Sequence, residues 1–255
     1  MSTGERSEQA GRPDVAATAR RVIGLIDLTN LANGHEPDGV AALLDDASSH
    51  RTAAVCVWPE FVAGAVDRLA GSGVHVATVA NFPGGNDDHD LVVDDVGRSL
   101  DAGADEIDVV MPYQPGGAGT DRPEELVAAV ARLVHDRGAR LKVILETGER
   151  PDRDSIVAAG RTAIANGADF LKTSTGKTPN GASLGAVDAM IDAIVGADRV
   201  VGLKPSGGIS TVADATAYLD LVERRLGAEA TDPRRFRIGA SSLLADAVSL
   251  LDDPH

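Results

Sequence analysis

Lysine is scarce in this sequence, and its few positions suggest covalent chemistry. Only Lys142, Lys172, Lys177 and Lys204 are lysine among the 255 residues, so arginine supplies all the other basic residues. Arginine stays protonated in a protein, whereas a lysine that is desolvated or lies beside another cation can lose its proton. The neutral amine is a nucleophile that forms an iminium ion with a carbonyl compound. The retained lysines are therefore candidates for amine catalysis.

The elements that must position these lysines follow a regular alternation. Amphipathic stretches of helical period, such as 124–138 and 152–167, end near a glycine and separate short apolar runs rich in β-branched residues. Strands are predicted over residues 22–28, 52–58, 74–80, 105–111, 140–146, 168–174, 199–205 and 235–241. Eight such alternations predict an α/β fold, a (β/α)₈ TIM barrel. The rival, a doubly wound open sheet, is disfavoured because no run is followed by a G-x-G-x-x-G turn.

The barrel is expected to form a single domain over residues 14–255, after a flexible N-terminal arm over residues 1–13. Active sites of such barrels lie at the carboxyl ends of the strands. Lys172 and Lys204 end the sixth and seventh predicted strands, and Asp108 lies in the fourth. Because side chains alternate between the two faces of a strand, all three can point into the barrel mouth, with Lys142 below them.

The loops after the seventh and eighth strands predict a phosphate site. Gly207 and Gly208 precede a helix expected near residue 211, and Ser241 and Ser242 stand at the next expected helix start. Exposed backbone N–H groups and helix N-termini at these loops commonly hold phosphate in barrels. Lys177 would add a positive charge. A phosphorylated ligand is therefore expected.

Two further residues complete the predicted substrate site. Thr29 stands directly after the first predicted strand, and Gly239 lies near the end of the eighth. The sequence "STGKT" at 174–178 resembles the end of a P-loop, but Leu171 stands where that motif requires glycine. A nucleotide-binding P-loop is therefore not predicted.

The sequence offers few metal ligands. Its six histidines form no H-x-H or H-x₃-H pair, and the acidic "GGNDDHD" at 84–90 reads as a solvated turn because consecutive loop residues cannot all converge on one ion. We expect neither a metal nor another cofactor. Cys56, the single cysteine, excludes an internal disulfide and is interpreted as a small core residue.

The composition narrows the possible partners. A net charge of −15 and a pI near 4.7 argue against nucleic acid and anionic membranes, since both need a basic surface. The N-terminus lacks the apolar core of a signal peptide, and no apolar run approaches the length of a membrane span. A soluble cytoplasmic protein is expected, with a homodimer left open as its assembly.

Several motifs, in order and over about residues 20–250, resemble those of the deoxyribose-phosphate aldolase family. They are "DLTNL" (27–31), "NFPGGND" (81–87), "GADEIDVVMPY" (103–113), "KVILETG" (142–148), "GADFLKTSTGK" (167–177), "GLKPSGGIST" (202–211) and "RIGASSLL" (237–244). The resemblance implies a metal-free class I aldolase. Such an enzyme cleaves 2-deoxy-D-ribose 5-phosphate to acetaldehyde and D-glyceraldehyde 3-phosphate in deoxyribonucleoside breakdown.

The resemblance also assigns roles that spacing alone leaves open. It implies that Lys172 forms the Schiff base, that Lys204 is the cation that keeps it deprotonated, and that Asp108 relays protons. Ser210 stands where members of the family often carry arginine, which puts the strength of phosphate binding in question. The main alternative is a non-catalytic phosphosugar-binding barrel, a sensor or scaffold, which would not need the two lysines and the acid. A metal-dependent aldolase or an isomerase is a further alternative, and the missing histidine pairs weigh against the aldolase.

Overall fold

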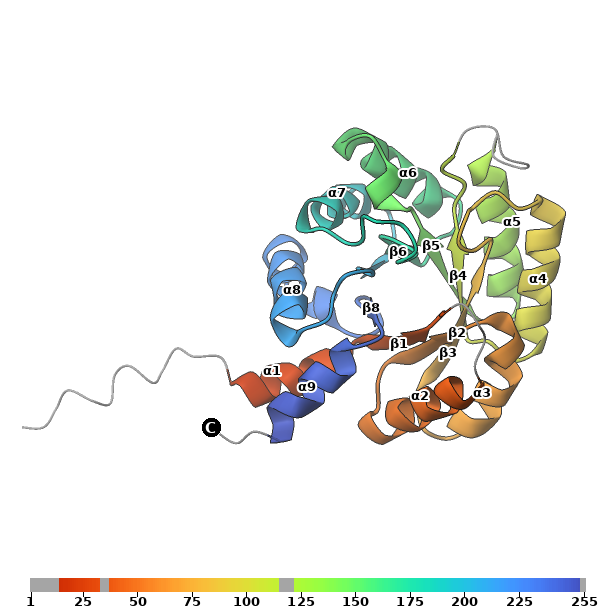
Figure 1. The fold of residues 1–255 in the computed structure, drawn as a ribbon. Coiled ribbons are helices and arrows are strands. Elements are labelled where there is room, and N and C mark those ends of the chain that lie inside the picture. The colour runs from red at the N-terminus through yellow and green to blue at the C-terminus, as the bar shows by residue number, and fades with distance from the viewer. Residues whose placement is uncertain (1–13, 33–36, 115–121, 253–255) are drawn as a thin grey trace, which may run out of the picture.

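A computed structural model describes residues 14–32, 37–114 and 122–252, which form a parallel barrel surrounded by helices (Figure 1). Its strands are β1 (Ile26–Asn30), β2 (Ala54–Val57), β3 (His75–Ala80), β4 (Glu106–Val110), β5 (Arg140–Ile144), β6 (Phe170–Lys172), β7 (Gly202–Lys204) and β8 (Ile238–Ala240). Its helices are α1 (Val15–Ile23), α2 (Pro37–His50), α3 (Val62–Leu69), α4 (His89–Asp101), α5 (Pro123–Asp136), α6 (Arg153–Ala165), α7 (Leu184–Val195), α8 (Val212–Leu226) and α9 (Leu243–Asp252).

The sheet closes almost completely. Hydrogen-bonded neighbours run in the order β7-β6-β5-β4-β3-β2-β1-β8, all parallel. Isolated parallel bridges, Leu203 with Phe236 and Ser206 with Gly239, join β7 to β8 and complete the circle. The predicted (β/α)₈ TIM barrel is confirmed, and the open doubly wound sheet is not the fold.

The first predicted strand was wrong at its beginning. Val22 and Ile23 were assigned to a strand over 22–28, but they end α1, and β1 starts only at Ile26. The Asp14 side chain caps α1 by accepting from the N–H of Ala17, and Val22 and Ile23 are buried on its inner face. The arm predicted over residues 1–13 lies outside the described residues.

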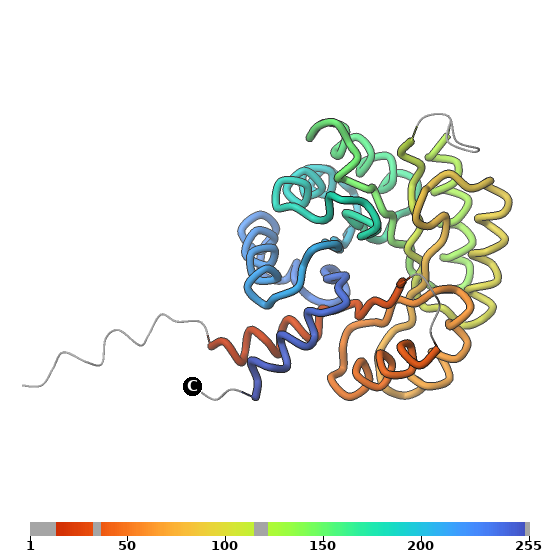
Figure 2. The backbone as a smooth tube through the Cα atoms, in the orientation of Figure 1, coloured from red at the N-terminus to blue at the C-terminus, as the bar shows by residue number. Residues whose placement is uncertain are grey.

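The two ends of the described chain lie together. Helix α1 packs beside α9 near the first and last strands, as the red and blue segments show (Figure 2). The predicted helices at 124–138 and 152–167 are confirmed as α5 and α6. Each is followed two residues later by a glycine with positive φ, Gly138 and Gly167. Only glycine adopts this conformation without strain. Among the described residues, no helix has both the length and the apolar character needed to cross a membrane.

The strands of the barrel are apolar on the face that packs against the helices, and the barrel interior carries buried charges. Between strands and helices, the core is built mainly from buried Val, Leu, Ile and Ala side chains. Seven charged side chains that pair with one another are buried within the barrel instead: Asp27, Glu106, Asp108, Lys142, Lys172, Lys204 and Arg237. Burying charges is costly unless they are paired, so this interior is a candidate site.

Candidate active site

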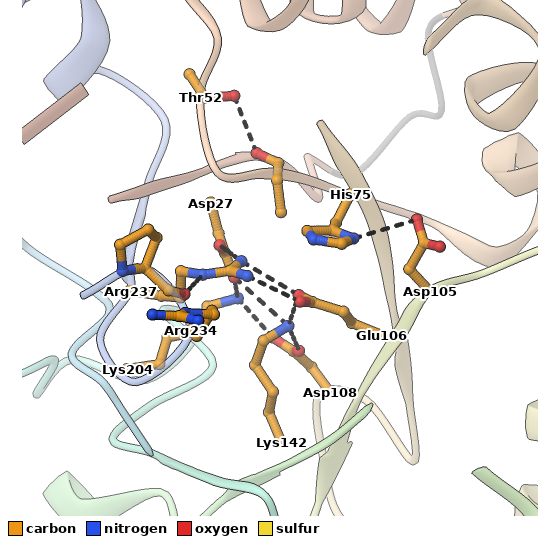
Figure 3. A network of polar contacts seen from close by, with 12 residues as sticks. Asp27, Thr52, His75, Asp105, Glu106, Asp108, Lys142, Lys204, Arg234 and Arg237 are labelled. Carbon is orange, nitrogen blue, oxygen red and sulfur yellow. Dashed lines mark hydrogen bonds and ion pairs between the residues drawn. The ribbon is translucent and has the colours of Figure 1, made fainter. Parts of the chain in front are cut away.

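Three lysines converge on one carboxylate. Lys142 donates to Oδ1 of Asp108 at 2.9 Å, while Lys172 and Lys204 donate to Oδ2 at 2.8 and 2.7 Å. Asp108, Lys142 and Lys204 have no exposed surface, and Lys172 is only 3% exposed. Figure 3 shows Asp108, Lys142 and Lys204 from close by. The predicted convergence of Lys172, Lys204 and Asp108 is confirmed as geometry, and Lys142, predicted to lie below them, contacts the same carboxylate.

Strand register brings these residues together. Asp108 on β4 is the register partner of Lys142 on β5, and Lys172 on β6 is the partner of Lys204 on β7. Lys172 is also paired with Ile144, two residues beyond Lys142 on β5. Partners in register point to the same face, so the alternation read from the sequence was sufficient to orient all four side chains inward.

A second layer of charges lies deeper in the barrel. Arg237 donates to Oδ1 of Asp27 at 2.7 Å and to Oε1 of Glu106 at 3.0 Å. Asp27 in turn lies 2.5 Å from Nζ of Lys204 and 3.5 Å from Nζ of Lys142, and Lys142 also pairs with Glu106. The two layers therefore form one continuous buried network (Figure 3).

The network fixes the charge of its carboxylates. Burial alone would raise the pKa of Asp108, but Lys142, Lys172 and Lys204 together hold that pKa well below its ordinary value. For Asp27, burial is likewise outweighed by Lys204 and Lys142 and by Arg237, so its pKa is lowered. Both groups are carboxylates at neutral pH.

The same ion pairs keep Lys204 and Lys142 charged. Burial works against the charge of Lys204, but Asp108 and Asp27 outweigh it and raise the lysine's pKa. Burial also opposes the charge of Lys142, and Asp108 with Glu106 raises that pKa above its ordinary value. These two ammonium groups are fixed cations in the floor of the site.

A cavity of about 710 Å³ opens above this floor. Its described lining comes from β1 and α2 and from the loops after β6, β7 and β8. The predicted site residues in that lining are Thr29, Lys172, Lys177, Gly207, Gly208, Gly239, Ser241 and Ser242. Asp108 and Lys204 lie beneath it. All the predicted substrate-binding residues thus meet at one cavity, and Lys172 is the member of the buried network that opens to it.

Two glycines make room in this cavity. A Cβ on Gly239 would meet Ser206 Cβ at 2.8 Å and Lys204 Cε at 3.1 Å, so a side chain here would displace the buried lysine. Gly207 has φ +88° and lies against Gly181, where a Cβ would be 3.1 Å from the Cα. The positive φ of Gly207 and of Gly208 turns the chain tightly after β7.

Lys177 is positioned at the rim of the cavity by Thr175, which is itself hydrogen-bonded to the buried Glu146. Glu146, with no exposed surface, accepts from the Thr175 hydroxyl at 2.6 Å and from its N–H at 3.2 Å. The Thr175 hydroxyl accepts in turn from the N–H of Lys177 at 3.1 Å. Nζ of Lys177 then reaches across the cavity to donate to the carbonyl of Leu31 at 2.6 Å. Lys177 thus provides a cation at the cavity's edge.

Cys56 and the acidic stretch 84–90 have structural roles. Cys56 is buried in a small cluster with Leu31, Ala77 and Val79, which confirms its interpretation as a core residue, and burial raises its thiol pKa. In the stretch 84–90, Asp88 caps α4 by accepting from backbone N–H groups. Within the part of the chain that the structure describes, no three His, Cys, Asp or Glu side chains form a group suited to a metal ion.

Sequence reasoning missed the deeper layer. Arg237 and Glu106 received no role, although each lies two residues before a predicted site residue on the same strand face, Gly239 and Asp108 respectively. A charged residue at such an inward position of a barrel strand is a usable signal, because an apolar residue would normally fill it.

Fold and site together define the class of this protein. It is a (β/α)₈-barrel enzyme whose mouth carries a buried amine poised on a carboxylate, the equipment of a carbon–carbon lyase that works through lysine. A family model described as "DeoC/LacD family aldolase" matches residues 21–247. The chain belongs to this aldolase family.

Individual relatives agree with the family assignment. A protein of Agrobacterium fabrum named deoxyribose-phosphate aldolase is 44% identical over 245 residues, which cover 94% of this chain and 93% of that protein. An apo structure from Toxoplasma gondii, described as a candidate deoxyribose-phosphate aldolase, is 25% identical with a TM-score of 0.82 and covers 93% of this chain and 98% of its own. A tetrameric deoxyribose phosphate aldolase of Aeropyrum pernix is 25% identical with a TM-score of 0.72, over 94% of this chain and 96% of that one.

Proposed function

We propose that the protein is a class I aldolase that reversibly cleaves 2-deoxy-D-ribose 5-phosphate to acetaldehyde and D-glyceraldehyde 3-phosphate through a Schiff base on Lys172. The observation that carries this proposal is the position of Lys172. Of the three lysines on Asp108, all within the described residues, Lys172 is the one that lines the cavity. A substrate carbonyl in the cavity can therefore reach its Nζ. The name of the 44% identical relative supports the choice of substrate.

Ion pairing also favours Lys172 as the neutral amine. Lys204 contacts two carboxylates and Lys142 contacts three, whereas Lys172 pairs with one carboxylate of the described residues, Asp108. That partner's Oδ2 is shared with Lys204. Lys172 therefore has the fewest carboxylate partners of the three, which suits a nucleophile and leaves Lys204 as the fixed neighbouring cation.

The proposed reaction begins at the aldehyde carbon C1 of the open-chain sugar. The neutral Nζ of Lys172 adds to C1, and the carbinolamine loses water to give an iminium ion. Removal of the proton from the C3 hydroxyl then breaks the C2–C3 bond, whose electron pair moves toward the iminium nitrogen. D-Glyceraldehyde 3-phosphate leaves, and an enamine of acetaldehyde remains on Lys172.

Completion of the cycle requires proton transfers at the same place. The enamine takes a proton at C2, and water hydrolyses the resulting iminium to acetaldehyde and free Lys172. Asp108 is suited to relay these protons because its Oδ2 contacts Nζ of both Lys172 and Lys204. Lys204 supplies a nearby proton donor that its carboxylate partners keep charged.

The far end of the cavity suits the 5-phosphate. Gly207 and Gly208 follow β7 with positive φ, and Ser241 and Ser242 precede α9, so a glycine turn and a helix N-terminus border the same cavity. Lys177 adds a cation at the rim. These features support a phosphorylated sugar over a neutral one.

We assign the enzyme to deoxyribose phosphate catabolism in the cytoplasm, an assignment supported by the acidic composition and the chemistry proposed. A homodimer is the assembly left open by the sequence. Light scattering would distinguish it from a tetramer of the kind described for the Aeropyrum pernix relative.

Borohydride trapping tests the proposed function. Incubation with acetaldehyde and borohydride should reduce the iminium to a stable amine, and peptide mapping should find the label at Lys172. A non-catalytic phosphosugar-binding barrel would bind deoxyribose 5-phosphate but give neither a label nor acetaldehyde. Label at Lys204 would reverse the roles of the two lysines.

A further inference from the structure

Arg237 is a large cation buried at the bottom of the site. It is 1% exposed, and its guanidinium lies between Asp27 and Glu106 with its Cζ 6.0 Å from the centroid of the Phe170 ring. Glu106 is equally buried at 1%. Neither residue is among the described residues that line the cavity. A buried ion pair is weak evidence for stability, since apolar residues of similar volume often serve as well, so its presence invites a functional explanation.

The buried network has unequal charge. Its cations are Lys142, Lys172, Lys204 and Arg237, and its carboxylates are Asp27, Glu106 and Asp108. With every group ionised, one positive charge is left over in this buried region. With Lys172 neutral, three cations balance three carboxylates. The network is therefore balanced in the state that the proposed nucleophile requires.

We propose that Arg237 and Glu106 are positioning residues that set the charge state of Lys172 from below, through Asp27, Lys204 and Asp108. This inference rests on the proposed function of Lys172. The chain of contacts is continuous: Arg237 pairs with Asp27, Asp27 with Lys204, and Lys204 shares the Oδ2 of Asp108 with Lys172. With Arg237 present, the network holds four cations against three carboxylates, so one positive charge is in excess. The carboxylate of Glu106 keeps that excess from being larger.

Opposite substitutions should therefore have opposite effects. Loss of the Arg237 charge leaves three lysines facing three carboxylates, so Lys172 retains its proton to higher pH. Loss of the Glu106 charge leaves four cations facing two carboxylates, so Lys172 loses its proton at lower pH. A shift of about one pH unit is expected for removal of one buried charge from such a network.

Other titratable groups face Lys172 from the surrounding strands, and the variants leave them in place. They are Asp27 on β1, Cys56 on β2, Asp108 on β4, Lys142 on β5, Lys204 on β7 and Lys177 at the rim. On β3 the titratable residue is His75, which starts that strand and so lies at the opposite end of the barrel from Lys172. His75 pairs with Asp105, and both are about half exposed. A phosphate group of the substrate titrates near pH 6 in every variant alike. A difference between variants therefore reports on the altered charges.

The test compares Arg237→Met, Glu106→Gln and the double variant. The readout is the pH profile of kcat/KM for cleavage of deoxyribose 5-phosphate. Its acidic limb should move up by about one pH unit in Arg237→Met, down in Glu106→Gln, and back near the unaltered position in the double variant. Arg225→Met, on the outer helix α8 where Arg225 pairs with Asp188 and Asp192, is the matched control and should leave the profile unmoved.

Two outcomes would overturn the inference. Profiles that keep their limbs while kcat falls, or limbs that move the same way in both single variants, mean a structural role alone. Circular dichroism checks the fold of each variant. If Arg237→Met does not fold, Glu106→Gln, which keeps the shape of the side chain, still decides, because an unmoved limb in that variant refutes the proposal.

Borohydride trapping distinguishes a failure of this inference from a failure of the proposed function. If borohydride labels Lys172 but neither limb moves, only the role of Arg237 and Glu106 fails. If borohydride with acetaldehyde labels no lysine in the unaltered protein, the proposed function fails and this inference fails with it.

Discussion

Lys172 and Lys204 are register partners on the neighbouring strands β6 and β7, and both donate to the same oxygen, Oδ2 of Asp108, at 2.8 and 2.7 Å. Two amines with the same neighbour nevertheless differ in surroundings. Lys204 has a second carboxylate, Asp27, at 2.5 Å and no exposed surface, whereas Lys172 borders the cavity. This difference separates a fixed cation from an amine that can react.

Lys172→Arg should abolish the covalent step. The guanidinium keeps a positive charge on Asp108 but cannot form an imine, so kcat for cleavage should fall by about four orders of magnitude or more. Borohydride with acetaldehyde should then label nothing at position 172.

Lys177→Arg is the matched control, since it makes the same replacement at the rim of the same cavity. In this variant borohydride should still trap acetaldehyde at Lys172, and the change in kinetics should be confined largely to KM. Substantial cleavage by Lys172→Arg would contradict its role as nucleophile.

Lys204→Leu should move the pH optimum upward. It removes one cation from the network, so Lys172 is expected to hold its proton to higher pH, and the pH profile of kcat/KM measures the shift. Trapping at Lys172 should persist at high pH. Asp27 and Asp108 each lose a partner, so the free energy of unfolding should drop by about 3 kcal/mol in urea titrations.

Lys204→Arg separates charge from shape. It keeps the cation, so the pH optimum should stay, although the larger side chain meets Gly239 and Ser206 and should lower kcat. An upward shift as large as that of Lys204→Leu would show that shape, not charge, sets the optimum.

Local pattern was enough to predict the mouth of the barrel. Lys172 and Lys204 stand out because each is a charged residue at the end of an apolar run, and Asp108 because it is a charged residue within one. The alternation of faces orients all three. The boundary of β1 was missed because "VIGLIDL" is short and has no charged residue before Asp27, so periodicity cannot separate the last turn of α1 from a strand.

The choice between the two lysines could not come from spacing. It depends on which amine meets a second carboxylate, and that partner, Asp27, lies on β1 and reaches Lys204 only when the barrel closes through β8. The role of Arg237 was hidden for the same reason. Its carboxylates lie on β1 and β4, far from it in the sequence.

Metal removal should have no effect on the reaction. Cleavage of deoxyribose 5-phosphate is proposed to proceed through the Lys172 imine, which needs no Lewis acid. Activity after exhaustive dialysis against EDTA should equal that of the untreated enzyme in a coupled assay for glyceraldehyde 3-phosphate. Loss of activity that zinc restores would contradict the class I mechanism.

Acid should destabilise the fold through Asp27 and Asp108. Burial opposes their charge, but the surrounding lysines, and Arg237 at Asp27, lower both pKa values below the ordinary value of 3.8. The unfolded chain therefore binds these protons first, near pH 4. The stability they contribute is complete above that pH and is lost as the pH falls toward the folded pKa values.

Urea unfolding between pH 7 and pH 3 measures this dependence. The slope of the unfolding free energy against pH below about pH 4 should be shallower in Asp108→Asn by up to about 1.4 kcal/mol per pH unit. The exposed Asp198→Asn serves as the control. An unchanged slope in Asp108→Asn would mean that its carboxyl titrates alike in both states.

Substitution at the start of α9 should discriminate between phosphorylated and neutral sugars. Ser241 and Ser242 are exposed to the cavity, beside the Gly207 and Gly208 backbone. Ser241→Glu with Ser242→Glu puts two carboxylates where the dianionic phosphate is proposed to sit, so repulsion should raise KM for deoxyribose 5-phosphate by about tenfold to a hundredfold. Activity on unphosphorylated deoxyribose should change much less, because that substrate has no charge there. Ser241→Gln with Ser242→Gln adds similar bulk without charge and should raise KM far less. If the glutamate variant loses activity equally on both sugars, these loops support the barrel mouth in general and the phosphate binds elsewhere.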